Sequence, residues 1–472
     1  MNFKIEDKIL KKISRFASDN NIQAYLVGGY VRDKLLDNTT SDVDIMVIGD
    51  AIQFAKQVAK LFVVPVLAVY KNFGTALINI EDLKIEFASA RKESYLRDSR
   101  KPIIELSDLK DDLARRDFTI NALAVPLFKT HKVIDNFNGL SDLKNRIIKT
   151  PLEPFKTFDD DPLRMLRAIR FASTLNFSIA PETFEAINSL KSRLKENKVV
   201  SQERITNEFL LIMMSDKPSI GLDLLYLSGV MDIIFPEMSK LGGVDQREDF
   251  HHKDVFYHTL NVVDNISNKT DNLWLRFTAL VHDIAKPKTK KFVEGTGWTF
   301  HSHEEVGARM LKNIFMKMKL PLNKLDYVEK LVRMHLRPIP IAKEEVTDSA
   351  VRRLAAEAGE ELEDLLTLCR ADITSKNPNK VKRFLTNFEI VEKKVIEVQE
   401  KDKLRNFQSP VRGEEIMEIC NLKPSREVGV IKKKIEEAIL DGEIPNEYEA
   451  AKEYLFLIKD EIIKNSFNKS NK

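Results

Sequence analysis

The sequence predicts an α+β domain at its amino-terminal end, followed by a long all-α remainder. Short apolar runs of β character recur between residues 22 and 145 and alternate with helical stretches. From about residue 151 those runs fade, and apolar residues recur at helical spacing, as in Leu163, Leu166 and Ile169. The chain has 472 residues, 43% hydrophobic and 31% charged, which is enough for several hydrophobic cores of a soluble protein.

The individual elements follow from periodicity and turn residues. Residues 1–20 form an amphipathic pattern that predicts the first helix. The runs at 23–27, 43–48, 76–80, 84–88 and 133–135 predict strands, separated by turn sequences such as Asn72-Phe73-Gly74. Proline and glycine interrupt the helical remainder near residues 218, 236–243, 287–297, 338–340, 378 and 410–413. The polar residues 465–472 are expected to fray.

Composition excludes several classes of protein. The only cysteines are Cys369 and Cys420, so we expect no disulfide framework and no cysteine-based zinc site, which fits a reducing cytoplasm. The longest apolar runs, such as residues 61–70, are too short to span a bilayer, and the polar amino terminus does not resemble a signal peptide. Because the net charge is only +3, a nucleic-acid surface must be local.

The most informative motif is the pair Asp42 and Asp44, which shares one face of the predicted strand at 43–48. A D-x-D sequence alone is more often a solvated strand end. Here Gly28 and Gly29 lie just upstream, where they allow the backbone to approach phosphates closely. Arg32 has a guanidinium group that can donate two hydrogen bonds to a phosphate. Phosphate handling beside paired carboxylates predicts divalent-metal-dependent nucleotidyl transfer.

A third metal ligand is needed for a two-metal site, and Glu86 in the run at 84–88 is the candidate, since that strand can lie beside the first. A second polar cluster, residues 115–123, contains Arg116, Asp117 and Asn121. Arginines bind phosphates, and Asp117 and Asn121 can hydrogen-bond to ribose hydroxyls, so this cluster is consistent with the entrance of a nucleotide pocket. A charged helix amino terminus with ordinary capping is an alternative, and the two interpretations are compatible.

A third cluster predicts selection of the nucleotide base. Asp161 and Arg164 are three residues apart at a helix start marked by Pro162, so they share a face. The aspartate can accept a hydrogen bond from the exocyclic amine of cytosine or adenine, and the arginine can donate to the adjacent ring nitrogen. Guanine and uracil mismatch both groups. The alternative is a helix salt bridge worth ~0.3–0.5 kcal/mol.

Together these motifs resemble the class II tRNA nucleotidyltransferase and bacterial poly(A) polymerase family. The resemblance covers residues 26–33, the D-x-D, residues 115–123 and residues 161–172, in that order. It implies a polymerase-β-like head, in which a mixed sheet packs with helices, followed by an all-α neck, body and tail. One departure is Asp160, where the family usually has glutamate.

The resemblance also implies roles for individual residues. The catalytic carboxylates would be Asp42, Asp44 and Glu86, with Asp42 and Asp44 binding two Mg²⁺ ions. The nucleotide-binding residues would be Gly28, Gly29, Arg32, Arg116, Asp117, Asn121, Asp160, Asp161, Arg164 and Arg167. The substrates implied are ATP, CTP and tRNA, with no membrane involved.

A second possible metal site lies in the middle of the chain. Six of the eight histidines fall between residues 251 and 303. A lone histidine is more often a buried core residue than a ligand, but an ordered histidine and aspartate set suits a metal that keeps open water positions. The set resembles an HD phosphohydrolase domain, which implies the metal ligands His258, His282, Asp283, His303, His335 and Asp372. The metal would be a divalent transition ion such as Ni²⁺, Mn²⁺ or Fe²⁺.

The HD resemblance implies phosphodiesterase or phosphatase activity on RNA 3′ ends, while a domain of this kind can also persist as a scaffold. The expected domains are a nucleotidyltransferase head over residues 1–145, a helical neck with the base-reading and RNA-binding motif over 146–245, the HD domain over 246–380, and a helical, tRNA-facing tail over 381–472. Lysines at 432–434 are candidates for tRNA phosphates, although such lysines usually form a solvated face.

Within the family, CCA addition is favoured. The long polar segment 91–110 resembles the flexible loop of full CCA-adding enzymes, and residues 413–450 resemble the family's tRNA-facing module, with Ser425 where glycine is common. An arginine-rich extension of the kind found in bacterial poly(A) polymerases is not present in this sequence. Three alternatives stay open: poly(A) polymerase, partial CC or A addition, and an HD phosphohydrolase whose head only binds nucleotide. The sequence also leaves the oligomeric state open.

Overall fold

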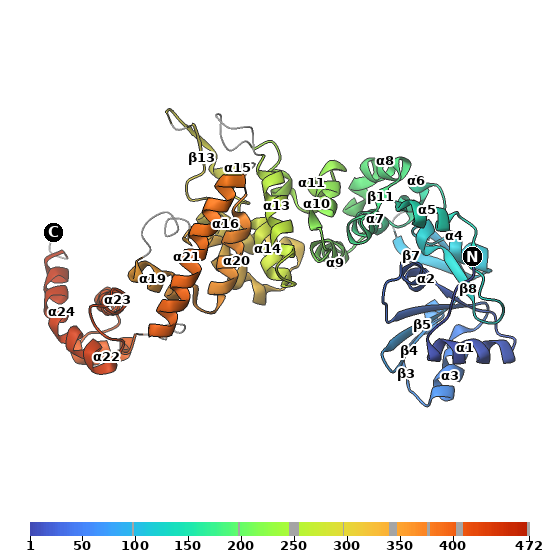
Figure 1. Ribbon diagram of the computed structural model, residues 1–472, viewed down its shortest axis with the longest axis horizontal. Helices are drawn as coiled ribbons and strands as arrows, with labels where there is room; N and C mark the ends of the chain where they lie inside the picture. The colour runs from blue at the N-terminus through green and yellow to red at the C-terminus, as the bar shows by residue number, and fades with distance from the viewer. Residues whose placement is uncertain are drawn as a thin grey trace. The chain divides into compact units, whose positions relative to one another are not determined.

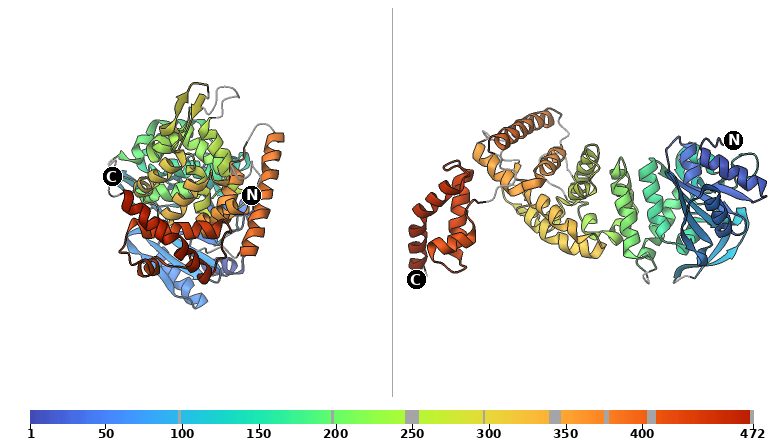
Figure 2. Two further views of the ribbon diagram at one scale, coloured as in Figure 1. Left: turned by 90° about the vertical axis from the view of Figure 1, so that its left-hand side faces the viewer. Right: turned by 90° about the horizontal axis from the view of Figure 1, so that it is seen from below.

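The computed structural model describes residues 1–96, 99–196, 199–244, 254–295, 297–338, 347–374, 378–402 and 409–469 (Figure 1, Figure 2). The chain forms two compact units. The first contains Met1–Ser239 with Met318–Leu320, and the second contains Lys240–Lys317 with Pro321–Lys472. The expected domain boundary at 245–246 and part of the break at 338–340 lie outside the described residues.

The first unit begins with a seven-stranded mixed sheet of order β3-β4-β5-β2-β1-β8-β9. Its strands are β1 (Ala24–Val27), β2 (Asp42–Val47), β3 (Val66–Tyr70), β4 (Thr75–Ile80), β5 (Leu83–Ser89), β8 (Leu123–Pro126) and β9 (Ile134–Asp135). Only the β2 and β5 pair is parallel. The predicted mixed sheet with helices is therefore confirmed.

One face of this sheet is covered by helices, and the other carries the polar motifs. Helices α1 (Lys8–Asp19) and α3 (Ala51–Phe62) pack against one face through buried residues such as Ile13 and Phe54, which share a core with Ile45 and Phe87. Because side chains alternate along a strand, burying Val43, Ile45 and Val47 turns Asp42, Asp44 and Met46 to the opposite face. Packing thus positions the D-x-D pair.

All five predicted strands are present, each within one residue of its expected limits. The sequence missed β8, which is buried at all four positions and therefore lacks the alternation that marks a half-exposed strand. It also missed the antiparallel hairpin of β6 (Arg91–Leu96) and β7 (Ser99–Leu106), which occupies the segment expected to be a loop. Backbone pairing, not apolar alternation, defines that hairpin.

The rest of the first unit is mainly helical. Its elements include α2 (Gly28–Leu35), α4 (Leu109–Ala114), η2 (Thr119–Asn121), α5 (Gly139–Asn145), α6 (Pro154–Asp160), α7 (Leu163–Leu175), α8 (Pro181–Leu190), α9 (Gln202–Met213), α10 (Pro218–Leu227), α11 (Val230–Ile234) and α12 (Pro236–Ser239). A short parallel bridge joins β10 (Ile147–Ile148) to β11 (Ser178–Ile179). Residues 115–118 lie between the end of α4 and the start of the 3-10 helix η2, whose N-cap residue Phe118 makes no side-chain cap hydrogen bond.

Over the residues that the structure describes, the second unit is helical except for one small hairpin. Its elements include α13 (Val255–Ser267), α14 (Leu273–Val281), α15 (Lys286–Thr289), α16 (His303–Met318), η5 (Leu322–Lys324), α17 (Leu325–Met334), α19 (Asp348–Ala358), α20 (Leu362–Asp372), α21 (Pro378–Asp402), α22 (Gly413–Cys420), α23 (Arg426–Leu440) and α24 (Tyr448–Lys469). The hairpin of β12 (Lys291–Val293) and β13 (Gly297–Thr299) departs from the all-α expectation.

Helices α22, α23 and α24 form a core of their own around Ile416, Ile431, Ile435 and Leu455. On α23, Lys432 Nζ lies 3.9 Å from Glu436 Oε1, and Lys433 Nζ lies 3.8 Å from Glu437 Oε1. Such exposed pairs contribute little to stability and leave both lysines accessible. Over the described residues, no helix is long and apolar enough to cross a membrane.

Candidate active sites

The acidic motifs of the head meet on the sheet face opposite to α1 and α3. The parallel pairing of β2 and β5 sets Asp44 directly opposite Glu86, and Asp42 lies two residues before Asp44 on the same face. The backbone at Gly28 has φ +68°, and a Cβ atom there would lie 2.8 Å from Asp44 Oδ2 and 3.1 Å from Arg116 Nη1. Glycine is therefore required here both for its left-handed conformation and for the close approach of the acid.

The electrostatics of this group favour a bound cation. Burial raises the pKa of Asp44, and the Asp42 carboxylate adds to the rise, although the Arg116 guanidinium opposes it. Burial and the Asp44 carboxylate also raise the pKa of Glu86. Neighbouring carboxylates that repel one another in a partly buried position are stabilised by a divalent ion, and three oxygen donors suit Mg²⁺.

The two arginines at 115 and 116 are held by an acid that the sequence interpretation missed. Asp112 is fully buried, and its Oδ1 accepts hydrogen bonds from Arg115 Nε and Nη2 at 3.1 Å and 2.5 Å. Its Oδ2 accepts one from Arg116 Nη2 at 3.0 Å. Asp112 therefore fixes both guanidinium groups, and that of Arg116 lies near Asp44. The spacings of three and four residues on a helix were the available signal.

A chain of polar contacts joins α2 to the loop after α4 and to α7. Arg32 Nη1 donates to Asn121 Oδ1 at 2.8 Å, and Asn121 Nδ2 donates to Asp117 Oδ1 at 2.9 Å. Asp117 Oδ2 then accepts from Arg167 Nε at 2.8 Å. Burial would raise the pKa of Asp117, but Arg167 and Asn121 bring it down to about 2. The carboxylate is therefore ionised and fixes both partners.

The network continues to a second residue that the sequence did not reveal. Glu208 on α9 is buried, and its Oε2 lies 2.7 Å from Arg170 Nε, while its Oε1 lies 3.7 Å from Arg167 Nη1. The guanidinium carbons of Arg32, Arg167 and Arg170 lie 4.8 Å, 5.3 Å and 4.2 Å from the centroid of the Phe171 ring. Glu208 is separated from its partners by a whole helix, so local spacing gave no signal.

The proposed base-reading residues lie at the junction of α6 and α7. Asp161 is buried in extended backbone conformation between the two helices, and its Oδ1 accepts a hydrogen bond from the Leu163 amide at 3.2 Å. Arg164 Nη2 donates to the Arg115 carbonyl at 2.7 Å. Burial raises the pKa of Asp160, against the pull of Arg164. The junction thus connects the second and third sequence motifs.

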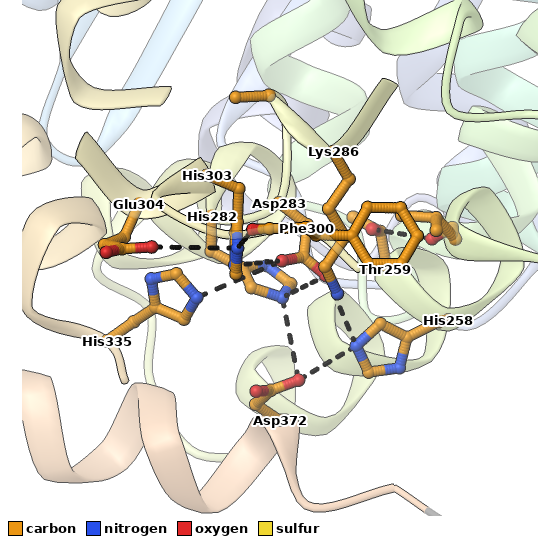
Figure 3. Close-up of polar contacts among 12 residues, drawn as sticks. His258, Thr259, His282, Asp283, Lys286, Phe300, His303, Glu304, His335 and Asp372 are labelled. Atoms are coloured by element: carbon orange, nitrogen blue, oxygen red, sulfur yellow. Dashed lines mark hydrogen bonds and ion pairs between the residues drawn. The ribbon is translucent and has the colours of Figure 1, made fainter. Parts of the chain in front are cut away.

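In the second unit, the histidines and aspartates expected to bind metal converge on one buried cluster (Figure 3). His258, His282 and Asp372 form one group of possible ligands, and Asp283, His303 and His335 form another; within each group the ligand atoms lie within 4.8 Å of one another. Asp283 links the two groups, because its Oδ2 lies 3.2 Å from His282 Nε2 and its Oδ1 lies 3.2 Å from His303 Nε2.

The hydrogen bonds of the histidine Nδ1 atoms show which ring nitrogens are available to bind a metal ion. Nδ1 of His282, His303 and His335 lies 2.7 Å, 2.7 Å and 2.6 Å from a backbone carbonyl, to which it can only donate. This leaves Nε2 with a lone pair directed inward, as in metal-bound histidines with an oriented second nitrogen. Among the described residues, these three buried Nε2 atoms have no aligned hydrogen-bond partner. The cluster therefore fits two divalent ions.

Burial lowers the pKa of His282, but Asp283 and Asp372 raise it to about 10, so a metal ion at this ring would replace the proton on Nε2. Burial would raise the pKa of Asp283, but His282 and Lys286 hold it well below its usual range. Burial and the charge of His282 lower the pKa of His335 to about 4, so this ring is neutral at physiological pH, as a ligand must be. Lys286 Nζ lies 2.6 Å from Asp283 Oδ2. This lysine was not expected from the sequence, although it stands three residues after Asp283.

Comparisons with known proteins place the same segments in three families. The model of the poly A polymerase head domain matches residues 24–149, that of the probable RNA and SrmB- binding site of polymerase A matches 176–241, and that of the HD domain matches 255–377. The A-adding tRNA nucleotidyltransferase of Deinococcus radiodurans is 31% identical over 349 residues, covering 73% of this chain and 78% of that protein.

Two further similarities extend this result. The multifunctional CCA protein of Aliivibrio salmonicida is 32% identical over 366 residues, covering 74% of this chain and 85% of that protein. A solved structure of a tRNA nucleotidyltransferase, complexed with a primer tRNA and an incoming ATP analog, superposes with a TM-score of 0.57 at 27% identity. That match covers 81% of this chain and 98% of the other.

Proposed function

The chain belongs to the tRNA nucleotidyltransferase and poly(A) polymerase family, and from this premise we propose that it adds C and A nucleotides to the 3′ end of tRNA without a template. It is a nucleotidyltransferase, and the substrates would be CTP, ATP and a tRNA lacking its terminal CCA. The observation that carries the proposal is the meeting of three carboxylates, Asp42, Asp44 and Glu86, with an arginine network on one face of the head.

The reaction is attack of the tRNA 3′-hydroxyl on the α-phosphate of the incoming nucleotide, with pyrophosphate leaving. Asp42, Asp44 and Glu86 would hold two Mg²⁺ ions, which when bound neutralise the triphosphate and lower the pKa of the attacking hydroxyl. The protein's own contribution is mainly to position the reactants. The left-handed turn at Gly28 and the adjacent Gly29 bring the start of α2 close to the phosphates.

The network around Asp117 would orient the nucleotide. Arg32 is held by Asn121 and Asp33, so its guanidinium is preorganised for phosphate oxygens. Arg116, fixed by Asp112 beside Asp44, would meet the same triphosphate. Asp117 and Asn121 would meet the ribose hydroxyls, and Arg167, held by Asp117, would complete the phosphate contacts.

Selection of the base would fall to Asp161 and Arg164, with Asp160 as a brace. The carboxylate accepts from the amine of cytosine or adenine, and the guanidinium donates to the neighbouring ring nitrogen. The bond from Arg164 to the Arg115 carbonyl ties this pair to the phosphate-handling loop. Base identity and triphosphate position are therefore set by connected residues.

Replacing Arg164 by alanine is expected to relax base selection. The ratio of kcat/KM for CTP to that for UTP should fall roughly 10-fold or more, because a specific base contact discriminates by about 1–3 kcal/mol. Steady-state incorporation with each nucleotide measures this ratio. Arg15→Ala, which removes an exposed arginine on α1, is the matched control and should leave the ratio unchanged. An unchanged ratio for Arg164→Ala would remove this residue from base selection.

The proposed function is tested by the products themselves. A tRNA without its 3′ end is incubated with CTP, with ATP or with both, and the products are sequenced. An unstructured RNA with ATP alone serves as the comparison. Long A tails on that RNA would favour the poly(A) polymerase alternative, whereas completion of CCA on tRNA supports the proposal.

A second function is supported by the inward-facing histidine cluster. We propose that the HD domain hydrolyses phosphate esters at RNA 3′ ends, such as 2′,3′-cyclic phosphates, with water as the second reactant. His258, His282, Asp283, His303, His335 and Asp372 would hold two transition ions, such as Ni²⁺, Mn²⁺ or Fe²⁺. When bound, these ions supply a nucleophilic hydroxide and neutralise the phosphate. Such an activity would make a blocked 3′ end extendable.

Partners and location follow from the proposed reaction. The lysines at 432–434 on α23 are candidates for tRNA phosphates, because two of the three lie in weak, exposed pairs. Both cysteines are free thiols, which fits work in a reducing cytoplasm, where tRNA maturation would take place.

A further inference from the structure

The β12–β13 hairpin is the least buried element near the HD cluster, and none of the activities above uses it. It is inserted between two candidate ligands of one group: the chain leaves the cluster at Asp283, forms α15 and the hairpin, and returns at His303. In Figure 1 the hairpin, labelled β13, stands out from the helices of its unit. The hairpin is therefore part of the connection between two of the candidate ligands.

One face of the hairpin is aromatic. Phe292 and Trp298 are register partners on opposite strands, and their ring centroids are 5.2 Å apart in an edge-to-face arrangement. Lys290 Nζ lies 4.4 Å from the centroid of the Trp298 ring. Phe292 is 49% exposed. Proteins that bind single-stranded nucleic acid use exposed aromatic rings beside cationic side chains to stack bases.

The same line of residues continues to the cluster. Phe300 follows Trp298 by two residues, and Lys286 Nζ lies 5.7 Å from the centroid of the Phe300 ring. Lys286 Nζ is in turn 2.6 Å from Asp283 Oδ2, and the Phe300 carbonyl lies 2.7 Å from His303 Nδ1 (Figure 3). Alternating rings and ammonium groups thus extend from the exposed hairpin to the ligands.

Charge along this line favours a polyanion. Lys290 has no carboxylate partner within the described residues, and the segment 286–291 contains four lysines and no acid. Free nucleotides need only a small pocket at the ligands, whereas a line of rings and cations matches successive bases and phosphates of one strand.

We propose that the aromatic face of the β12–β13 hairpin binds the single-stranded 3′ end of an RNA and directs its terminal phosphate to the HD cluster. The proposal rests on the phosphohydrolase function proposed above and specifies its substrate class. Phe292 and Trp298 stack on bases near the end of the strand, Lys290 contacts the backbone phosphates, and Lys286 contacts the terminal phosphate.

The test compares two substrates in the full-length, metal-loaded protein: 2′,3′-cyclic AMP and a short single-stranded RNA ending in a 2′,3′-cyclic phosphate. For the double variant Phe292→Ala/Lys290→Ala, KM for the RNA should rise about 10-fold or more, as expected for loss of one stacked base and one phosphate contact. KM and kcat for cyclic AMP should stay within twofold.

The same hairpin offers a matched control. Lys291 and Val293 alternate with Phe292, so they lie on its opposite face, and the double variant Lys291→Ala/Val293→Ala removes the same formal charge. It should leave the RNA KM within about threefold of the unchanged protein.

If Phe292→Ala/Lys290→Ala loses activity equally on RNA and on cyclic AMP, the hairpin only supports the ligands. If the two double variants raise the RNA KM equally, the hairpin contributes only its positive charge. Either result overturns the proposal.

A measurement without turnover separates this inference from the activity on which it rests. An RNA carrying 4-thiouridine at its 3′-terminal nucleotide is crosslinked to the full chain, and the adduct is mapped by mass spectrometry. A crosslink within residues 290–300 is expected, and its absence overturns the proposal. If the unchanged protein hydrolyses neither substrate, the phosphohydrolase function fails, and the crosslink alone decides whether the hairpin binds RNA.

Discussion

Replacing Asp44 by alanine is expected to lower nucleotide incorporation by at least about 10³-fold, because the variant loses the carboxylate that faces Glu86 and with it a ligand of the proposed metal site. Binding of tRNA should stay within about twofold, since recognition of tRNA would depend on phosphates and shape along helical surfaces. Incorporation of labelled CMP and AMP measures the first quantity, and fluorescence anisotropy with labelled tRNA measures the second.

Asp82→Ala provides the control for this experiment. Asp82 is an exposed acid in the turn between β4 and β5, so its removal changes the charge of the same sheet without touching the carboxylate group. It should retain full incorporation. If Asp44→Ala incorporates nucleotides normally, the two-metal account of the head is wrong, and the acids on β2 serve another purpose.

Replacing Asp283 by asparagine is expected to abolish phosphohydrolase activity, with a loss of at least about 10³-fold on 2′,3′-cyclic AMP. Asp283 lies between the two ligand groups, and asparagine keeps its shape while removing the charge that both ions would share. Metal content, measured by mass spectrometry on the purified protein, should fall as well. Nucleotide incorporation by the head should stay within twofold.

The control for Asp283→Asn is Asp326→Asn, which changes an exposed acid in the first turn of α17. It should keep both metal content and hydrolysis. Full hydrolysis by Asp283→Asn, or unchanged metal content, would contradict the proposed metal centre. An unchanged protein that binds metal but hydrolyses nothing would leave the HD domain as a scaffold.

The sequence predicted the strands that carry the acids because their alternation is strong. Val43, Ile45 and Val47 are buried against α1 and α3, and Asp42 and Asp44, which alternate with them, point to the opposite face. Strand β8 escaped prediction because it is buried on both faces and therefore lacks alternation. The hairpin of β6 and β7 escaped because its strands are defined by backbone pairing within a polar sequence.

The candidate site residues were predictable where they stand in short sequence motifs. The residues that hold them in place, such as Asp112 and Glu208, were not predicted. Asp112 was detectable in principle from its spacing to Arg115 and Arg116. Glu208 contacts Arg170 from another helix, a contact that only tertiary packing creates. The same holds for the convergence of His258 and Asp372, whose Nε2 and Oδ1 atoms are 2.9 Å apart although the residues are far apart in the sequence.

We expect this single chain to complete the CCA end of tRNA from CTP and ATP. The most direct measurement offers a tRNA that ends before its CCA to the purified chain and sequences the products made with CTP, with ATP and with both. We predict that CTP alone yields two added C residues and that both nucleotides yield CCA with no further extension. Extension by A alone, or A tails of unlimited length, would contradict this account.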